Sequence, residues 1–381
     1  MAKKRGNGEG SIYKCKDRPG YRASYTVQTA KGPKRRYVSG KTRREVEEKL
    51  TKAKAERDGG LVFDAGDLTL GEYLDRWLSD SVRDAVKQST FENYEYVVRR
   101  HLRPSLGRTK LKVLAPAQVQ GLYRAKLDSG LSARTVQLIH TVLHKALKQA
   151  VRWGLVPRNV TDAVTAPKPA KEATKGIRVL NADQARTLLG AARGDRLEAL
   201  YVLAITAGLR EGELLGLRWQ DVDLEGATLS VRQQLTRTKK DGLCFTTPKS
   251  PKSRRSVRLT RSAVEALERH RRRQLEEKSR LAGLWRDTGL VFTSTTGTPL
   301  DVGNLTYRSF RPLLEQADLS RIRFHDLRHT CATLLLSKNV NPKVVQERLG
   351  HANISETMDT YSHVLPSMQE TAVNATEDIL T

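Results

Sequence analysis

Residues 324–364 read FHDLRHTCATLLLSKNVNPKVVQERLGHANISETMDTYSHV and bring together histidines, arginines and one tyrosine. His325, Arg328 and His329 are three and four residues apart along this stretch, and such spacings return to one face of a helix. The apolar run 334–336 follows them. The start of the stretch therefore predicts a helix that presents two imidazoles and one guanidinium on the same side.

The rest of the stretch predicts two further short helices. Asn341 and the proline after it are typical of a helix start, and Gly350 is typical of a helix end. His351 follows that end directly, and Tyr361 lies ten residues further on, in the segment 354–364. We therefore expect an imidazole at one helix end and a phenol on a separate piece of the chain.

These side chains suit the chemistry of a phosphodiester. An arginine presents a charged planar fork that matches two phosphate oxygens. A tyrosine attacks phosphorus once cationic neighbours favour its phenolate or a base accepts its proton. A second arginine-bearing segment lies upstream, where residues 208–219 read GLREGELLGLRW. Within it, Glu213 lies three residues after Arg210 and can hold that guanidinium by a charged hydrogen bond.

The motifs H-x-x-R, L-G-H, the tyrosine and the upstream G-L-R-x-x-E-L segment together resemble the tyrosine recombinase family, the phage integrases. Each motif alone is weak evidence, but all four occur in the family's order across the second half of the chain. The resemblance implies a site-specific recombinase that integrates a phage or mobile element through a 3′-phosphotyrosyl intermediate. It implies a catalytic set of Arg210, Lys249, His325, Arg328, His351 and Tyr361.

The resemblance also implies how these residues act. Tyr361 would attack the scissile phosphorus while Lys249 protonates the departing 5′ oxygen, and the two arginines would hold the nonbridging oxygens. His325 would be a proton acceptor or a phosphate ligand, and His351 a hydrogen-bond donor to phosphate. The sequence leaves the division between these two histidines open. Because the 5′-hydroxyl of a partner strand reverses the step, no ATP, metal or other cofactor is required.

The lysine assignment has two candidates. Residues 248–255 read PKSPKSRR, between two strand-like runs, and the family has its lysine on this hairpin. Lys249 aligns best, with Lys252 as the alternative. As a solvated basic loop, the segment would touch DNA backbone phosphate through Lys252, Arg254 and Arg255.

Neither a metal site nor a disulfide framework is predicted. His325 and His329 have the spacing of a zinc pair, but the glutamate of H-E-x-x-H is missing and the arginine between them would repel a cation. Cys15, Cys244 and Cys331 lie far apart in no paired spacing, which indicates a reducing compartment.

Composition favours a nucleic-acid partner. The chain has 381 residues, enough for two or three domains, with 68 Lys and Arg against 42 Asp and Glu and a formal net charge of +26. Such a surplus favours a polyanion such as double-stranded DNA, although a ribosomal-type or chaperone-like basic surface is the alternative. No apolar run approaches the roughly 18 residues of a membrane span. We therefore expect a cytoplasmic, nucleoid-associated protein with no membrane partner.

Residues 1–58 form the first predicted domain and hold 18 Lys and Arg against 6 Asp and Glu over residues 1–57. Three strand-like runs, 11–14, 21–27 and 35–38, precede a helix at 42–57 and predict a small α+β domain. It resembles the arm-binding domain of phage integrases; a basic face with no specific partner is the alternative. The residues expected to contact DNA are Arg22, Lys34, Arg35 and Arg36.

Residues 69–166 predict an all-α bundle. Its first helix has apolar residues at i, i+3, i+4, i+7 and i+8 from Leu70, the stripe of an amphipathic helix. Lys145, Lys148 and Arg152 form a basic stripe on the last helix. In the family, a helical (SAM-like) domain at this position binds the core site, so the resemblance implies DNA contact here.

Residues 176–381 follow a proline-rich basic linker and predict a mainly α catalytic domain with a small antiparallel sheet. The expected fold class is thus multidomain: α+β, then all-α, then mainly α. The resemblance implies a homotetramer on core and arm DNA sites, with a host DNA-bending protein and an excisionase as partners. Two readings compete with a recombinase: a DNA-binding regulator and a type IB topoisomerase.

Overall fold

The computed structural model describes residues 12–15, 19–29, 32–58, 67–168, 178–248, 253–361, 373, 376–378 and 380. The chain divides into two compact units, Met1–Ala170 and Lys171–Thr381. Within the described residues no helix is long and apolar enough to cross a membrane. The predicted fold class is confirmed, because an N-terminal sheet, a helical region and a mainly helical region with small sheets follow one another.

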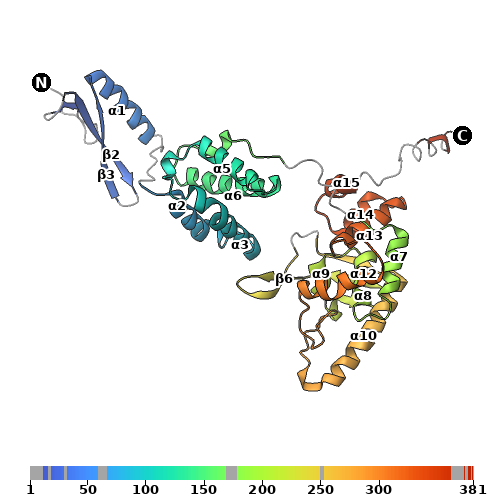
Figure 1. Ribbon diagram of the computed structural model, residues 1–381. Helices are drawn as coiled ribbons and strands as arrows, with labels where there is room; N and C mark the ends of the chain where they lie inside the picture. Colours follow the sequence, from blue (N-terminus) through green and yellow to red (C-terminus); the bar gives the residue numbers. More distant parts are fainter. Residues whose placement is uncertain are drawn as a thin grey trace. The chain divides into compact units, whose positions relative to one another are not determined.

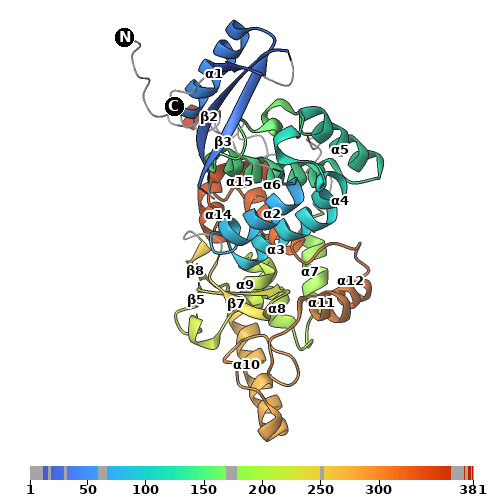
Figure 2. The same cartoon turned by 90° about the vertical axis from the view of Figure 1, so that its left-hand side faces the viewer.

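The N-terminal part is a three-stranded antiparallel sheet in the order β1-β2-β3, with helix α1 against one face (Figures 1 and 2). The elements are β1 (Ile12–Lys14), β2 (Tyr21–Thr29), β3 (Gly32–Gly40) and α1 (Arg43–Asp58). Ala23 pairs with Val38 and both pack against the helix with Val46. Opposite pairs share a face, so the alternate residues of each strand form the outer face.

A helical bundle follows in the first unit. Its elements are α2 (Leu70–Trp77), the π-helical turn η1 (Leu78–Val82), α3 (Gln88–Val97), the π-helical turn η2 (Val98–Leu102), α4 (Arg103–Leu106), η3 (Leu111–Val113), α5 (Pro116–Asp128), α6 (Ala133–Arg152) and η4 (Val160–Ala163). Thr69 begins α2 with a reciprocal capping box to Glu72. The predicted stripe from Leu70 is entirely buried. Its Tyr73 donates a hydrogen bond to the Ala146 carbonyl of α6, which fixes the two helices together.

The second unit is built around α8, whose residues are almost all buried. Its helices are α7 (Ala182–Ala191), α8 (Glu198–Thr206), α9 (Glu211–Leu215), η6 (Trp219–Asp221), α10 (Arg261–Leu281), η8 (Ala282–Leu284), α11 (Val302–Leu305), η9 (Thr306–Phe310), α12 (Arg311–Gln316), α13 (Asp326–Ser337), α14 (Pro342–Leu349) and α15 (Ile354–Tyr361). Helices α10 and α13 both pack on α8, which is why an apolar run without helical amphipathicity lies here.

The strands of this unit form two small sheets where the sequence predicted one. They are β4 (Val222–Asp223), β5 (Thr228–Val231), β6 (Gln234–Thr238), β7 (Gly242–Thr246) and β8 (Arg255–Arg258). Strand β5 lies between β4 and β8, while β6 and β7 pair with each other as a hairpin. Strand β5 ends at Val231, and the chain then enters β6 beside α9. Both sheets are antiparallel, as expected.

Candidate active site

The first arginine of the site is placed by a glycine turn between α8 and α9. Gly208 has a φ of +62°, in the left-handed region that favours glycine, and ends the α8 segment. Arg210 is the N-cap residue of α9, with extended backbone, so its side chain leaves the helix start. It donates to Glu213 Oε1 at 2.8 Å, and its backbone N–H donates to Oε2 at 3.0 Å. The predicted support of Arg210 by Glu213 is therefore present in the structure.

Glu213 holds a second arginine as well. Its side chain is 1% exposed, and Arg255 of β8 donates to both of its oxygens, at 3.0 and 3.3 Å. Burial alone would raise the pKa of Glu213, but Arg255 and Arg210 lower it overall. The Glu213 carboxylate is thus a buried anion shared between two guanidinium groups.

The end of α14 binds three arginines through its last carbonyls. Arg255 Nε donates to the Arg348 carbonyl at 2.6 Å, Arg328 Nη2 to the Leu349 carbonyl at 2.6 Å, and Arg210 Nη2 to the Gly350 carbonyl at 3.2 Å. The last carbonyls of a helix have no partner within it and bear partial negative charge. This helix end therefore gathers guanidinium groups from three separate segments of the chain.

Arg328 is the most buried of these arginines, with 3% of its surface exposed. Besides the contact to α14, its Nη1 donates to the Gly208 carbonyl at 2.6 Å. Burial, then Arg210 and Arg255, lower the pKa of Arg328 to about 9. Because a guanidinium has five N–H donors, two carbonyl contacts leave donors available for an anion.

His351 and His325 lie on either side of this arginine in the sequence, at two helix ends. The turn at Gly350, with a φ of +68°, leads directly to His351, whose Nδ1 lies 2.8 Å from Thr357 Oγ1 of α15. Burial, then Arg328 and Arg210, lower the pKa of His351 to about 3. His325 is the N-cap residue of α13; burial of part of its ring, then His329 and Arg328, lower its pKa to about 4. Both imidazoles are thus neutral near pH 7.

Tyr361 ends α15 and is 2% exposed. It packs among Ala332, Leu336 and other apolar residues of α13 and α14. Burial raises the pKa of its phenol, while Arg328 lowers it in part. The phenolic oxygen lies 2.6 Å from His329 Nδ1. Helices α13, α14 and α15 lie together in Figure 1, so the three motifs of the stretch 324–364 converge.

The general-acid candidates Lys249 and Lys252 lie outside the described residues. Within the described residues there is no group of three or more His, Cys, Asp or Glu that could hold a metal ion.

The predicted DNA-contacting residues fall into two sets. Arg22 and Arg35 lie on the outer face of the N-terminal sheet, where the Arg22 guanidinium stacks 4.0 Å from the ring centre of Tyr37. Arg36 pairs with Tyr25, which packs on the helix side, so Arg36 lies on the inner face and its contact with DNA stays a prediction. Lys34 pairs with Val27 in the same ladder. On α6 the residues Lys145, Lys148 and Arg152 are exposed, and their contact with DNA stays a prediction.

Arg255 also differs from its prediction. Arg254 is exposed, but the Arg255 side chain is only 7% exposed and is committed to Glu213 and to the end of α14. A solvated loop residue that touches backbone phosphate is therefore the wrong description of Arg255. Arg255 instead binds Glu213 and the end of α14, and so helps to position the other arginines of the site.

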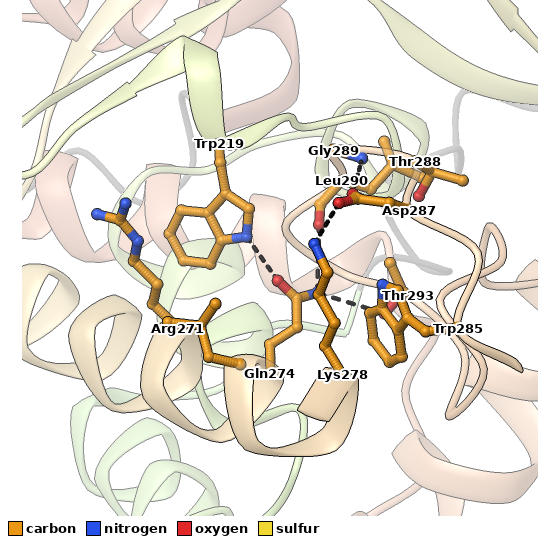
Figure 3. A pocket seen from close by; sticks show the side chains of 11 residues that line it. Trp219, Arg271, Gln274, Lys278, Trp285, Asp287, Thr288, Gly289, Leu290 and Thr293 are labelled. Carbon is orange, nitrogen blue, oxygen red and sulfur yellow. Dashed lines mark hydrogen bonds and ion pairs between the residues drawn. The ribbon is translucent and has the colours of Figure 1, made fainter. Parts of the chain in front are cut away.

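A cavity of about 170 Å³ lies elsewhere in the second unit, between the C-terminal half of α10 and residues 285–293 (Figure 3). Its polar groups pair with one another: Trp219 donates to Gln274 at 2.6 Å, and Lys278 forms an ion pair with Asp287. None of the arginines, histidines or the tyrosine of the site lines it. This cavity is therefore not the centre of the chemistry.

Comparison with known proteins identifies the family. Residues 178–368 match the phage integrase family, and residues 69–127 match the phage integrase N-terminal SAM-like domain. A tyrosine recombinase XerC-like protein of Caldanaerobacter subterraneus is 32% identical over 94% of this chain and 96% of its own length. The chain belongs to the phage integrase family. An integrase of Streptomyces ambofaciens is 30% identical over 98% of this chain and 97% of its own length.

Solved structures share the fold of this phage integrase family member. The Tn1549 transposon integrase, in complex with a circular intermediate DNA, superimposes with a TM-score of 0.68 at 21% identity, over 82% of this chain and 99% of that one. A lambda integrase dimer bound to a core site gives 0.55 at 22% identity, over 94% and 97%. As a tyrosine recombinase, the chain is an enzyme of DNA recombination and integration.

Two residues of this integrase were missed by the sequence reasoning as parts of the site. His329 contacts the phenol, whereas the sequence offered His325 as proton acceptor. Arg255 was placed on a solvated loop. The position of His329 on the same helical face as His325 and Arg328 was a usable signal, but the contact itself depends on how α15 packs. The pairing of Arg255 with Glu213 joins residues 42 positions apart and has no local signal.

Proposed function

We propose that this protein is a site-specific recombinase that integrates a phage or other mobile element into DNA and, with a partner, excises it. The convergence of one buried phenol with two arginines and neutral imidazoles is the observation that supports this proposal most directly. The named relatives agree with it, since they include the ICEBs1 integrase of Bacillus subtilis and the integrase of Staphylococcus phage L54a.

The cleavage step assigned to this site is a transfer of a phosphoryl group. Tyr361 Oη attacks the scissile phosphorus, its proton passes to a neighbouring imidazole, a tyrosyl O–P bond forms, and the bond from phosphorus to the 5′ oxygen breaks. Lys249 gives a proton to the departing 5′ oxygen, with Lys252 as the alternative donor. Arg210 and Arg328 bind the nonbridging oxygens, where negative charge increases in the transition state.

The remaining histidines serve the same phosphate. His351 presents a ring N–H to a phosphate oxygen, since its other nitrogen faces Thr357, and His325 lies at the start of α13 beside the arginine. The products are a 3′-phosphotyrosyl bond and a free 5′-hydroxyl. Attack by the 5′-hydroxyl of another strand reverses the step, so the energy of the original bond is kept and no cofactor enters the balance.

The arrangement of domains follows from the same proposal. Residues 1–58 form an arm-binding domain, residues 69–166 a core-binding domain and residues 176–381 the catalytic domain. Arg22 and Arg35 on the outer sheet face, Lys145, Lys148 and Arg152 on α6, and the exposed Arg254 supply positive charge for backbone phosphates. Lys34, Lys252 and Arg36 stay predictions as further DNA contacts.

Assembly on DNA is the last part of the proposal. A lambda integrase tetramer bound to a Holliday junction has the same fold, with a TM-score of 0.54 over 91% of this chain. We expect a homotetramer that exchanges one pair of strands at a time. A host DNA-bending protein and an excisionase are the expected partners for integration and for its reversal.

The decisive experiment uses a nicked suicide duplex that contains a core site taken from DNA flanking the gene. Wild type should form a protein–DNA adduct that survives denaturation and forms in EDTA, while Tyr361→Phe should form none. Wild type should then join the cleaved strand to a partner duplex. Relaxation of supercoils without strand joining would indicate a topoisomerase, and binding of the site without any adduct would indicate a regulator.

A further inference from the structure

The phenol of Tyr361 already has a hydrogen-bond partner in the structure, and it is an imidazole. His329 Nδ1 lies 2.6 Å from Tyr361 Oη, and the two ring centres are 5.7 Å apart with planes tilted by 56°. The tyrosine side chain is removed from water. Within the described part of the chain, no other side chain lies at hydrogen-bond distance from this oxygen.

The protonation state of His329 follows from its surroundings. Burial and the cations Arg328 and Arg323 lower its pKa, while Asp326 opposes them. The ring is therefore neutral near pH 7, and in the tautomer that carries its proton on Nε2 the Nδ1 atom has a free lone pair. In that tautomer the phenol O–H is the donor and the imidazole the acceptor, which is the arrangement that a base needs. Titratable and charged groups surround this pair on each element packed against it. They are Arg323, His325, Asp326, Arg328 and Cys331 before and on α13, His351 after α14 and Glu356 on α15.

The other histidines are less well placed for this proton. His351 follows the end of α14, and its Nδ1 lies 2.8 Å from Thr357 Oγ1. His325 meets His329 edge to face, with ring centres 5.0 Å apart, and it is His329 that hydrogen-bonds the phenol. Of the three, His329 alone contacts the oxygen that would attack.

We propose that His329 is the general base of strand cleavage, a role that rests on the proposed function of the site. As the O–P bond to Tyr361 forms, the phenolic proton passes to His329 Nδ1, and the ring becomes an imidazolium. Arg328 and Arg323 disfavour this cation, whereas Asp326 stabilises it. When a 5′-hydroxyl attacks the phosphotyrosyl bond, the leaving phenolate takes the same proton back, so the ring is regenerated in each cycle.

The test compares His329→Asn, His329→Gln and wild type in cleavage of the suicide duplex. Asparagine places an amide oxygen near the position of Nδ1, so it keeps an acceptor but cannot take a proton. We expect both variants to form the adduct about 100- to 1000-fold more slowly than wild type at pH 7. Their rates should rise about tenfold per pH unit up to pH 9, as phenolate forms without help, while the wild-type rate levels off.

A second substrate separates base from acid. In a duplex with sulfur as the 5′ bridging atom, the leaving thiolate needs no proton. A variant of Lys249 or Lys252 that has lost the general acid should therefore regain its cleavage rate on this duplex. The defect of His329→Asn should persist on this substrate. Recovery there, or cleavage of the ordinary duplex within threefold of wild type with the wild-type pH profile, would overturn the proposal and leave His329 a positioning residue.

Two controls keep the outcome readable. Thermal melting and DNA binding identify a variant that fails to fold. If the Gln and Asn variants melt like wild type and bind DNA but cleave slowly, the defect lies in the chemical step. If wild type itself forms no adduct while binding its site, the proposed function fails. If wild type reacts and Tyr361→Phe does not, the proposed function stands and only the role of His329 is decided.

Discussion

Glu213 is the residue on which two of the three site arginines depend. Its carboxylate lies 2.8 Å from Arg210 and 3.0 Å from Arg255, with 1% of its side chain exposed. Removing one partner of a buried ion pair leaves uncompensated charge and costs about 3 kcal/mol or more. We expect Glu213→Ala to lose about 3 kcal/mol in the free energy of unfolding at pH 7, measured by urea denaturation, and to lose cleavage.

The matched control is Glu265→Ala, which removes an equally short but exposed ion pair with Arg261. Exposed pairs contribute about 0–1 kcal/mol, so this variant should be nearly as stable as wild type. Equal losses in both variants would contradict the account of Glu213. Because the pKa of Glu213 is lowered in the folded state, its contribution is present above the unfolded pKa and declines as the pH falls through the folded one.

Glu211, one residue after Arg210, has a pKa shift of the opposite sign: its pKa is raised, whereas that of Glu213 is lowered. The Oε1 atom of Glu211 is buried with no hydrogen-bond partner among the described residues, and burial raises the pKa of this carboxyl group from 4.5 to about 7. Folding is therefore unaffected by this group at low pH and is penalised as the pH rises through about 7. We expect Glu211→Gln to gain about 1–2 kcal/mol in the free energy of unfolding at pH 8 and little at pH 4.5.

The exposed Glu225 provides the comparison for this prediction, since Glu225→Gln should change stability by less than about 0.5 kcal/mol at either pH. A gain for Glu211→Gln that is the same at both values would show that the effect is not one of ionisation.

At the scale of elements, the turn between α8 and α9 packs closely against α13 and α14 and also binds one arginine of the site. A Cβ on Gly208 would lie 2.6 Å from Leu349 Cδ2 and 3.1 Å from Cys331 Sγ, and the φ of +62° is itself unfavourable for other residues. The Gly208 carbonyl also anchors Arg328. We expect Gly208→Ala to lose at least 2 kcal/mol in stability and to lower the cleavage rate, measured on the suicide duplex.

A second glycine separates this effect from a general one. Gly190 is exposed near the end of α7, and a Cβ added there would meet no atom within 4 Å, so Gly190→Ala should stabilise the protein by about 0.5 kcal/mol. A loss in Gly190→Ala similar to that in Gly208→Ala would contradict the argument from close approach.

The elements also show what could be predicted from the sequence. The helix around His325, the helix end at Gly350 and the capped start at Asn341 were predictable, because caps, glycine and helical spacing act over a few residues. The division of the predicted sheet into two, with β6 and β7 as a separate hairpin, was not predictable, since strand partners are chosen by packing over longer distances. The same reason hid the burial of Arg255, whose partners lie on α9 and at the end of α14.

At the scale of the whole molecule, the formal net charge of +26 favours association with a polyanion such as DNA. Binding that displaces counterions from 6–10 phosphates weakens about 10³- to 10⁵-fold between 50 and 200 mM salt. We expect Lys148→Ala and Arg152→Ala each to reduce the slope of log Kd against log salt by about 1. Arg124→Ala removes the same charge from α5, where Arg124 is paired with Asp128, and should leave the slope unchanged.

The convergence of distant segments on the end of α14 has a consequence for synthesis. During translation the basic N-terminal residues emerge first, and Arg210, Arg255 and Arg328 follow in that order. The carbonyls that orient these arginines, and the tyrosine itself, emerge only after them. If the proposed function holds, a growing chain therefore exposes its basic N-terminal residues well before the parts needed for cleavage are complete.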